Sequence, residues 1–216
     1  MDCVLFDMDG VMVDSEDYWT ELQREEILPQ TVPGEDVEVE EVTGMNYREI
    51  YDYLDEEYGT ALTREEFVGI FEDTAEELYG ERVSLLEGLH ELLEELHERD
   101  VRTALVSSSP HDWIDIVLER FDLEGEFDAV VSAEDIDGPG KPEPAIFEHA
   151  AGELGVSADR CVAVEDSENG VEAAARAGTT VVAYRIDAHG DIDLSPADAV
   201  ADDPDELREA ILARTE

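Results

Sequence analysis

Short, wholly apolar runs alternate with amphipathic helical patterns along most of this chain. The runs lie at residues 3–6, 103–106, 129–131, 161–164 and 180–183, with a weaker one at 197–201. The helical patterns between and after them lie at 110–121, 142–154, 168–177 and 204–213. A strand that is apolar on both faces belongs in a parallel sheet covered by helices on each side. The alternation therefore predicts an α/β fold with a Rossmann-like parallel sheet, and ligands at the carboxyl ends of its strands.

The alternation is interrupted between residues 15 and 82, where no strand pattern occurs. This segment holds helical patterns at 15–27, 46–58 and 63–78, and a loop-like stretch at 29–41. A leucine-rich helical pattern at 84–98 then returns the chain to the sheet. The sequence thus predicts an α/β core of residues 1–14 and 83–216, with a helical cap domain of residues 15–82 inserted after the first strand.

Acidic residues dominate the composition, with 60 Asp and Glu against 13 Lys and Arg and a formal net charge of −47. Such a polyanion is repelled by the phosphate backbone of nucleic acids and by anionic membrane surfaces, so we expect neither as a partner. Because 43% of the residues are hydrophobic and fall in periodic runs, the chain can still bury a core. We therefore expect a folded protein, as a monomer or weak dimer.

The only two cysteines, Cys3 and Cys161, each lie in an apolar run without a CxxC partner, which indicates buried reduced thiols. No run approaches the 18 or so apolar residues of a membrane span, and the N-terminus lacks the basic start of a secretion signal. These features predict a cytoplasmic location.

Lys141 is the only lysine, and the other 12 basic residues are Arg. Acid enrichment with lysine depletion suits a cytosol of molar salt, where the Debye length is about 3 Å and self-repulsion is screened. We therefore hypothesise a halophilic host. The alternative is an acidic interaction protein, such as a nucleic-acid mimic. Such a protein would gather its acids on one face, whereas here they are spread along the chain from Glu16 to Glu216.

Two carboxylates follow the first apolar run, in Asp7-Met8-Asp9-Gly10. One carboxylate at a strand end can attack phosphorus, while the other, when protonated, can donate to the leaving oxygen. Glycine lets the chain turn after them. On its own, the pattern fits a metal-binding turn or a solvated loop equally well.

Two further segments could bind a phosphate. Ser107 and Ser108 follow the second apolar run and precede a helix, where hydroxyls and free amides can hold an anion, although a helix cap is the alternative. Lys141, in the segment 140–144, precedes another helix. Because lysine is absent elsewhere, we expect its compact ammonium to be functional rather than decorative.

Glu165 and Asp166 end the fourth apolar run, where hard oxygen ligands suit Mg²⁺, although a helix cap again explains the pattern. With Asp7 and Asp9, they would place up to four negative charges in one pocket. A divalent cation and Lys141 would return three positive charges, and a proton on Asp9 would bring the site close to neutrality. Together these segments predict a metal-assisted phosphoryl-transfer site.

The segments DMDGV (7–11), LVSS (105–108), GKPEP (140–144) and VEDSENG (164–170) resemble, in order, the four motifs of the haloacid dehalogenase superfamily. The agreement extends over essentially the whole chain. The helical insertion resembles the small cap of the β-phosphoglucomutase and phosphoglycolate phosphatase branch. The resemblance implies an Mg²⁺-dependent hydrolase that acts on a small phosphorylated metabolite through an aspartyl-phosphate.

The resemblance also implies roles for the motif residues. Asp7 would be the nucleophile, and Asp9 would be the general acid and then the base that activates water. Ser107, Ser108 and Lys141 would hold the phosphoryl oxygens. Because a dehalogenase has no leaving oxygen to protonate, Asp9 argues for phosphate chemistry.

An Mg²⁺ site is implied in the same way. Its ligands would be the Asp7 carboxylate, the Asp9 main-chain carbonyl and Asp166, with Glu165 as a ligand or an outer support. The magnesium would be the enzyme's cofactor.

The cap departs from the mutase pattern. Residues 17–19 (Asp-Tyr-Trp) stand where β-phosphoglucomutase has a histidine, and the cap has no lysine, which also disfavours phosphonate hydrolysis through a Schiff base. A phosphosugar mutase is therefore the alternative to a phosphatase. Candidate substrate-binding residues are Asn46, Tyr47 and Arg48, for which cap packing or a helix start is the alternative role. Of the five histidines, only His111 is expected near the site.

We expect this fold to depend on salt, because unscreened repulsion among its acids destabilises the compact state. Circular dichroism should show a higher melting temperature in about 2 M KCl than in salt-free buffer. An unchanged fold and melting temperature in the two buffers would contradict the halophilic hypothesis.

Overall fold

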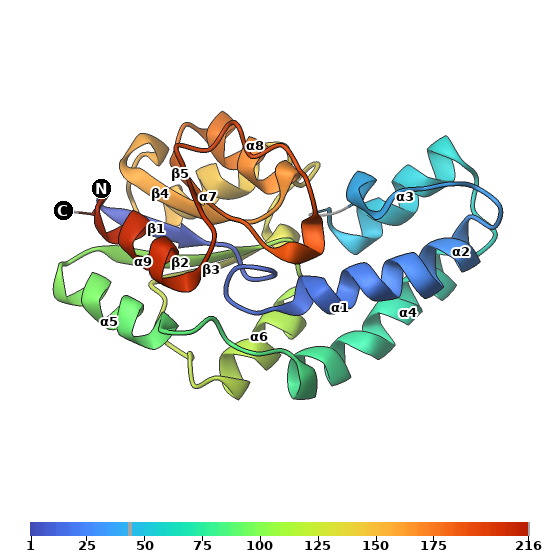
Figure 1. Cartoon of the computed structure of the whole chain (residues 1–216), viewed down its shortest axis with the longest axis horizontal. Helices are drawn as coiled ribbons and strands as arrows, with labels where there is room; N and C mark the ends of the chain where they lie inside the picture. The colour runs from blue at the N-terminus through green and yellow to red at the C-terminus, as the bar shows by residue number, and fades with distance from the viewer. Residues whose placement is uncertain (43–44, 216) are drawn as a thin grey trace.

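The computed structural model describes residues 1–42 and 45–215, and its core is a six-stranded parallel sheet (Figure 1). The strands are β1 (Cys3–Phe6), β2 (Arg102–Ser107), β3 (Ala129–Ser132), β4 (Cys161–Glu165), β5 (Thr180–Tyr184) and β6 (Ala199–Ala201), in the order β3-β2-β1-β4-β5-β6. Each predicted apolar run overlaps one of these strands, so the α/β prediction with a Rossmann-like sheet is confirmed. The strand order reverses between β1 and β4, where an open parallel sheet leaves a crevice for ligands.

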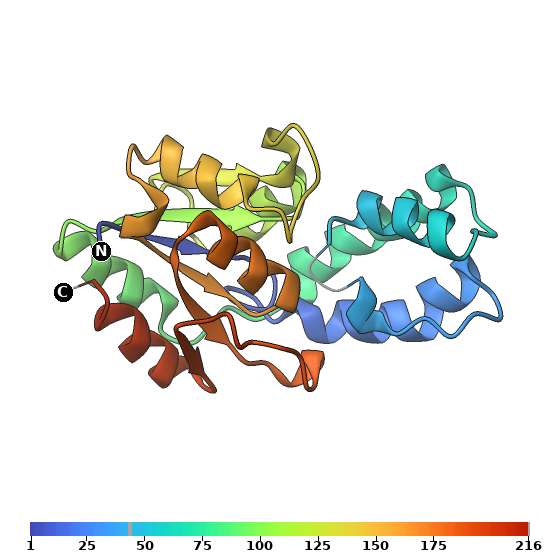
Figure 2. The same cartoon turned by 90° about the horizontal axis from the view of Figure 1, so that it is seen from above.

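Helices cover both faces of this sheet (Figures 1 and 2). One face carries α5 (Leu89–Glu98), α6 (His111–Arg120) and α9 (Pro204–Leu212), and the other carries α7 (Ala145–Glu153) and α8 (Glu168–Ala177). Val4 and Phe6 of β1 pack into the first apolar cluster, whereas Cys3 and Leu5 pack into the second. Because both faces are buried, the strand sequences are continuously apolar rather than alternating.

Between β1 and α5 the described residues form helical elements and two isolated β-bridges (Asp9 with Val13, and Val13 with Leu85), but no strand. The helical elements are α1 (Ser15–Leu22), the π-helical turn η1 (Gln23–Ile27), α2 (Leu28–Thr31), the 3-10 turn η2 (Val39–Glu41), α3 (Tyr47–Glu57), α4 (Arg64–Glu77) and the π-helical turn η3 (Leu78–Arg82). Figure 2 shows them together on the side toward which the strands point. The predicted helical insertion is confirmed, and its limits at residues 15 and 82 as a separate domain stay a prediction.

The two chain segments that connect the cap with the core, residues 12–14 and 84–86, are hydrogen-bonded to each other. The Leu86 N–H donates to the Met12 carbonyl at 2.8 Å, and the Asp14 N–H donates to the Ser84 carbonyl at 3.2 Å. The pairing fixes where α1 begins, and so holds the first turn of α1 against the loop that follows β1.

The two cysteines lie opposite each other in β1 and β4. Cys3 pairs with Cys161 in the strand register, their Cα atoms are 4.8 Å apart, and they form a disulfide. The prediction of reduced thiols is wrong, because nothing in the sequence shows that two strands 158 residues apart are neighbours. Reduced cysteines therefore no longer support a cytoplasmic location, since disulfides persist mainly in oxidising compartments. Among the described helices, none has the length and apolar character needed to cross a membrane.

Candidate active site

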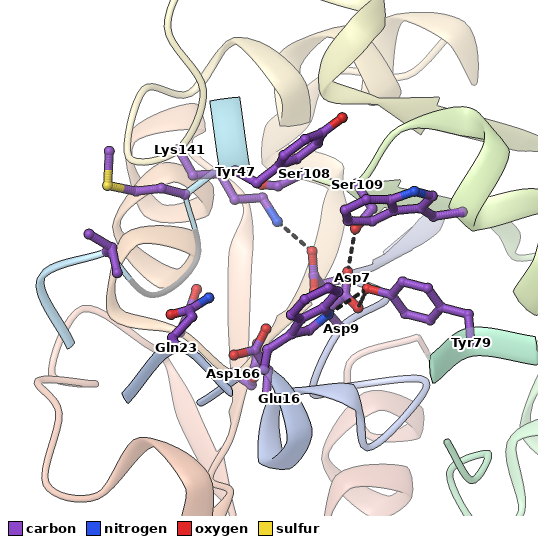
Figure 3. Close-up of a pocket in the computed structure, with 15 residues that line it drawn as sticks. Asp7, Asp9, Glu16, Gln23, Tyr47, Tyr79, Ser108, Ser109, Lys141 and Asp166 are labelled. Carbon is purple, nitrogen blue, oxygen red and sulfur yellow. Dashed lines mark hydrogen bonds and ion pairs between the residues drawn. The ribbon is translucent and has the colours of Figure 1, made fainter. Parts of the chain in front are cut away.

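The structure brings three of the predicted charged segments into direct contact at the carboxyl ends of β1 and β4 (Figure 3). Asp7 follows β1, Glu165 ends β4, and Lys141 lies just ahead of α7. The Lys141 ammonium, in a residue that is 4% exposed, donates to a carboxylate oxygen of Asp7 and, at 2.5 Å, to Oε1 of Glu165. The lone lysine therefore joins two acids that are 158 residues apart in the sequence.

Burial controls the ionisation of this cluster. It raises the pKa of Asp7 well above its ordinary value, although Lys141 opposes the shift. It also raises the pKa of Asp166, where the charges of Glu165 and Glu16 add to the effect. Burial lowers the pKa of Lys141, but Asp7 and Glu165 outweigh it, so the pKa is raised and the ammonium persists. One ammonium thus leaves excess negative charge in the cluster.

The donor set fits a hard divalent cation. Asp7, Glu165 and Asp166 each offer an oxygen within 4.8 Å of the others. Oδ2 of Asp166 is buried and accepts no hydrogen bond from the described residues, although Nδ1 of His189 lies 3.5 Å from it. Glu165 is already occupied, because its second oxygen accepts the N–H of Asp166 at 3.1 Å while the first accepts Lys141. A cation such as Mg²⁺ would satisfy the free oxygen of Asp166 together with Asp7, with Glu165 supporting the lysine.

Asp9 is held apart from this ion-paired group by hydroxyl donors. Ser15 Oγ and Tyr79 OH each donate to Oδ1 at 2.6 Å, and Ser109 Oγ donates to Oδ2 at 2.8 Å. Trp19 Nε1 in turn donates to Tyr79 OH at 3.0 Å. Burial, followed by the charge of Glu16, raises the pKa of Asp9, and the hydroxyl donors only reduce that shift. Asp9 can therefore carry a proton more readily than an ordinary aspartate.

The three serines after β2 have different positions. Ser108 and Ser109 line the cavity, whereas the fully buried Ser107 does not. Ser107 Oγ accepts the Ser109 N–H at 3.0 Å and lies 3.5 Å from Oδ2 of Asp9. Ser107 therefore stabilises the conformation of the loop of residues 107–109. A direct contact of Ser107 with phosphate stays a prediction. The serine run at 107–109 is part of the predicted phosphate-binding segment, but the contact of Ser109 with Asp9 is not predicted by the sequence.

Among the predicted cap residues, Tyr47 alone lines the cavity, with its ring stacked on Trp113 at 4.9 Å between centroids. Asn46 caps α3 and donates its side-chain amide to the Ser108 carbonyl at 2.6 Å. Arg48 pairs with Glu134 at 3.1 Å. Asn46 and Arg48 thus attach the cap to the core outside the cavity.

The prediction that only His111 lies near the site is wrong. His111 is the first residue of α6, is partly exposed, and bonds Asp135 at 2.9 Å. His189, 3% exposed, instead bridges the Asp166 carbonyl at 3.2 Å and Glu16 Oε2 at 3.1 Å. Burial lowers the pKa of His189, but its hydrogen bond to Glu16 and the Glu16 charge outweigh this, so the pKa is raised. No sequence pattern marks a loop histidine, and only the fold places it behind Asp166.

The site combines the groups needed to move a phosphoryl group. They are a buried carboxylate, a second carboxylate able to carry a proton, an ammonium, and an acidic pair able to hold a cation. At the strand ends of an open α/β sheet, they define an enzyme of the phosphatase type. The chain belongs to the haloacid dehalogenase-like hydrolase family, whose model matches residues 4–184.

Named relatives agree with this class. Hexitol phosphatase B of Escherichia coli (strain K12) is 34% identical over 185 residues, which cover 82% of each chain. The phosphorylated carbohydrates phosphatase of Thermotoga maritima is 31% identical over 178 residues, again 82% of each chain. The crystal structure of β-phosphoglucomutase from Clostridium difficile shares the fold, with a TM-score of 0.78, 24% identity, and coverage of 100% of this chain and 97% of that one.

The close approach of Gly10 to Asp166 gives a test of the cation site. Gly10 has a φ of +76°, and a Cβ at this position would overlap Oδ2 of Asp166. We expect Gly10→Ala to displace that carboxylate and to weaken Mg²⁺ binding about tenfold or more, measured by isothermal titration calorimetry.

Gly59 provides the matched control, because its φ is also +76° and a Cβ there meets nothing within 4 Å. Gly59→Ala should carry the backbone strain of about 1 kcal/mol without changing Mg²⁺ affinity. Thermal unfolding of both variants separates strain from displacement. Equal Mg²⁺ affinities in the two variants would show that this contact does not position Asp166.

Proposed function

We propose that the protein is an Mg²⁺-dependent phosphomonoester hydrolase that acts on a small phosphorylated carbohydrate through an aspartyl-phosphate. The observation that carries this proposal is the buried Lys141 ammonium, shared by Asp7 and Glu165 beside an oxygen of Asp166 that accepts no hydrogen bond from the described residues. The carbohydrate class is supported by relatives named as phosphatases of hexitols and of phosphorylated carbohydrates.

In the first half-reaction, a carboxylate oxygen of Asp7 attacks phosphorus. A P–O bond to Asp7 forms as the P–O bond to the leaving alcohol breaks, and the alcohol oxygen takes the proton carried by Asp9. The raised pKa of Asp9, caused mainly by burial, favours the protonated form that this step needs. Lys141 and the loop of residues 107–109 hold the phosphoryl oxygens.

In the second half-reaction, Asp9 acts as a base. Its carboxylate accepts a proton from water while the water oxygen attacks phosphorus, the bond to Asp7 breaks, and inorganic phosphate leaves. Asp7, the Asp9 main-chain carbonyl and Asp166 would hold Mg²⁺, whose contribution is to neutralise charge on the transferring group. Both half-reactions use the same carboxyl group of Asp9 in its two protonation states.

The nucleophile can be tested directly. Asp7→Asn retains the size of the side chain but removes the attacking oxygen, so release of phosphate from glucitol 6-phosphate should fall about 10³-fold or more. Removal of divalent cations with EDTA should abolish release in the parent protein, and MgCl₂ should restore it. Asp36→Asn, a matched change at an exposed loop position, should retain parental activity. Comparable rates for Asp7→Asn and the parent would overturn the assignment.

The alternative, a phosphosugar mutase, differs in where the phosphoryl group goes. A mutase transfers it to another sugar hydroxyl, whereas a hydrolase transfers it to water. With β-glucose 1-phosphate and Mg²⁺, we expect inorganic phosphate to appear in step with free glucose. Accumulation of glucose 6-phosphate without phosphate release would favour the mutase.

A further inference from the structure

Aromatic and neutral side chains from the cap and from α6 form much of the lining of the cavity above the catalytic carboxylates. These lining residues are Trp19, Gln23, Met45, Tyr47, Tyr79 and Trp113. The Trp113 ring stacks between Trp19, at 5.8 Å, and Tyr47, at 4.9 Å. These walls offer flat apolar surfaces, which suit the C–H face of a carbohydrate chain.

The cavity has no cation to spare for a second anion. In the described ranges Lys141 is its only cationic residue, and the ammonium is engaged by Asp7 and Glu165. The two internal positions outside those ranges, residues 43 and 44, are Thr and Gly in the sequence and carry no charge. Arg48, in the first turn of α3, does not line the cavity and pairs with Glu134.

The cavity does contain one free neutral polar group. Gln23, in η1, is 9% exposed, and its amide makes no hydrogen bond to another described residue. Figure 3 shows the amide end pointing into the cavity, on the same side as Asp166 and Glu16. Because the amide lines the cavity and has no hydrogen-bond partner among the described residues, a ligand hydroxyl at this position can hydrogen-bond to it without displacing a protein contact. An amide can both donate to a hydroxyl and accept from one.

We propose, building on the hydrolase activity proposed above, that the cavity selects phosphomonoesters with an uncharged polyol as the leaving group. Gln23 binds a hydroxyl of that group and is the specificity-determining residue. A carboxylate or second phosphate on the leaving group would instead meet Glu16 and the aromatic walls without a compensating cation. Repulsion in a buried cavity is strong and is little screened by salt.

Two substrates that differ in a single group test this selection. Glucitol 6-phosphate and 6-phosphogluconate share the same carbon chain, and differ only in a hydroxymethyl group or a carboxylate at C1. With saturating Mg²⁺ and matched ionic strength, we expect kcat/KM to be at least about tenfold higher for glucitol 6-phosphate.

Variants of Gln23 test the residue itself. Gln23→Arg supplies the missing cation and should reduce or reverse the preference by raising kcat/KM for 6-phosphogluconate. Gln23→Leu should raise KM for glucitol 6-phosphate about tenfold with a smaller change in kcat, because it removes a binding contact away from the reacting atoms. Gln30 is the matched control, since it is the other glutamine, lies in α2 and is exposed. Gln30→Arg and Gln30→Leu should leave both values at the parental level, and circular dichroism reports folding of all four variants.

The outcomes separate the two proposals. Equal efficiency on both substrates, or a preference for 6-phosphogluconate in the parent protein, overturns the selection while leaving the hydrolase activity established. A parental KM in Gln23→Leu overturns the role of Gln23. Failure of the parent protein to release phosphate from these and other phosphomonoesters overturns the proposed function itself, and the selection with it.

Discussion

The structure depends on one buried positive charge. Lys141 is enclosed between Asp7 and Glu165, among the acids that follow β1 and end β4. Removing an ammonium from water is costly, and two carboxylates at contact distance are needed to offset that cost. The same ammonium also offsets the repulsion between the carboxylates, which burial makes stronger. Lys141 thus joins the end of β1, the end of β4 and the loop ahead of α7 into one site.

The sheet topology makes this arrangement possible. β1 lies between β2 and β4, so the loops that follow these three strands open onto a common crevice. Close packing then sets the distances within it, because Gly10 and Gly170 leave no room for a Cβ beside Asp166 and Glu165, respectively. The cap completes the site from the other side, since its first helix brings Ser15 to Asp9 at 2.6 Å. A catalytic carboxylate is therefore oriented by both parts of the molecule.

The sequence predicts the parts of this site that are contiguous along the chain. Continuous apolar runs followed by acids are sufficient to locate Asp7, Glu165 and Asp166 at strand ends, and the lone lysine stands out by composition. Contacts between distant segments leave no such pattern. The Cys3–Cys161 disulfide and the support of Asp166 by His189 arise from neighbouring strands and loops that only the fold defines. A single glutamine in an acidic helix likewise resembles surface composition until its burial is known.

The exposed acidic residues and the buried acidic residues of the site are neutralised by different kinds of positive charge. Exposed acids along the helices interact over distances that mobile ions screen, with a Debye length of about 3 Å at molar salt, so any monovalent salt can relieve their repulsion. The carboxylates of Asp7 and Asp166 are buried and reached poorly by such ions. Beyond Lys141, their charge is compensated by a cation that enters the crevice and binds their oxygens. Bulk salt therefore cannot replace a bound divalent cation. Because lysine and arginine are scarce in the crevice, a negative charge on the leaving group of the substrate would also lack a compensating cation.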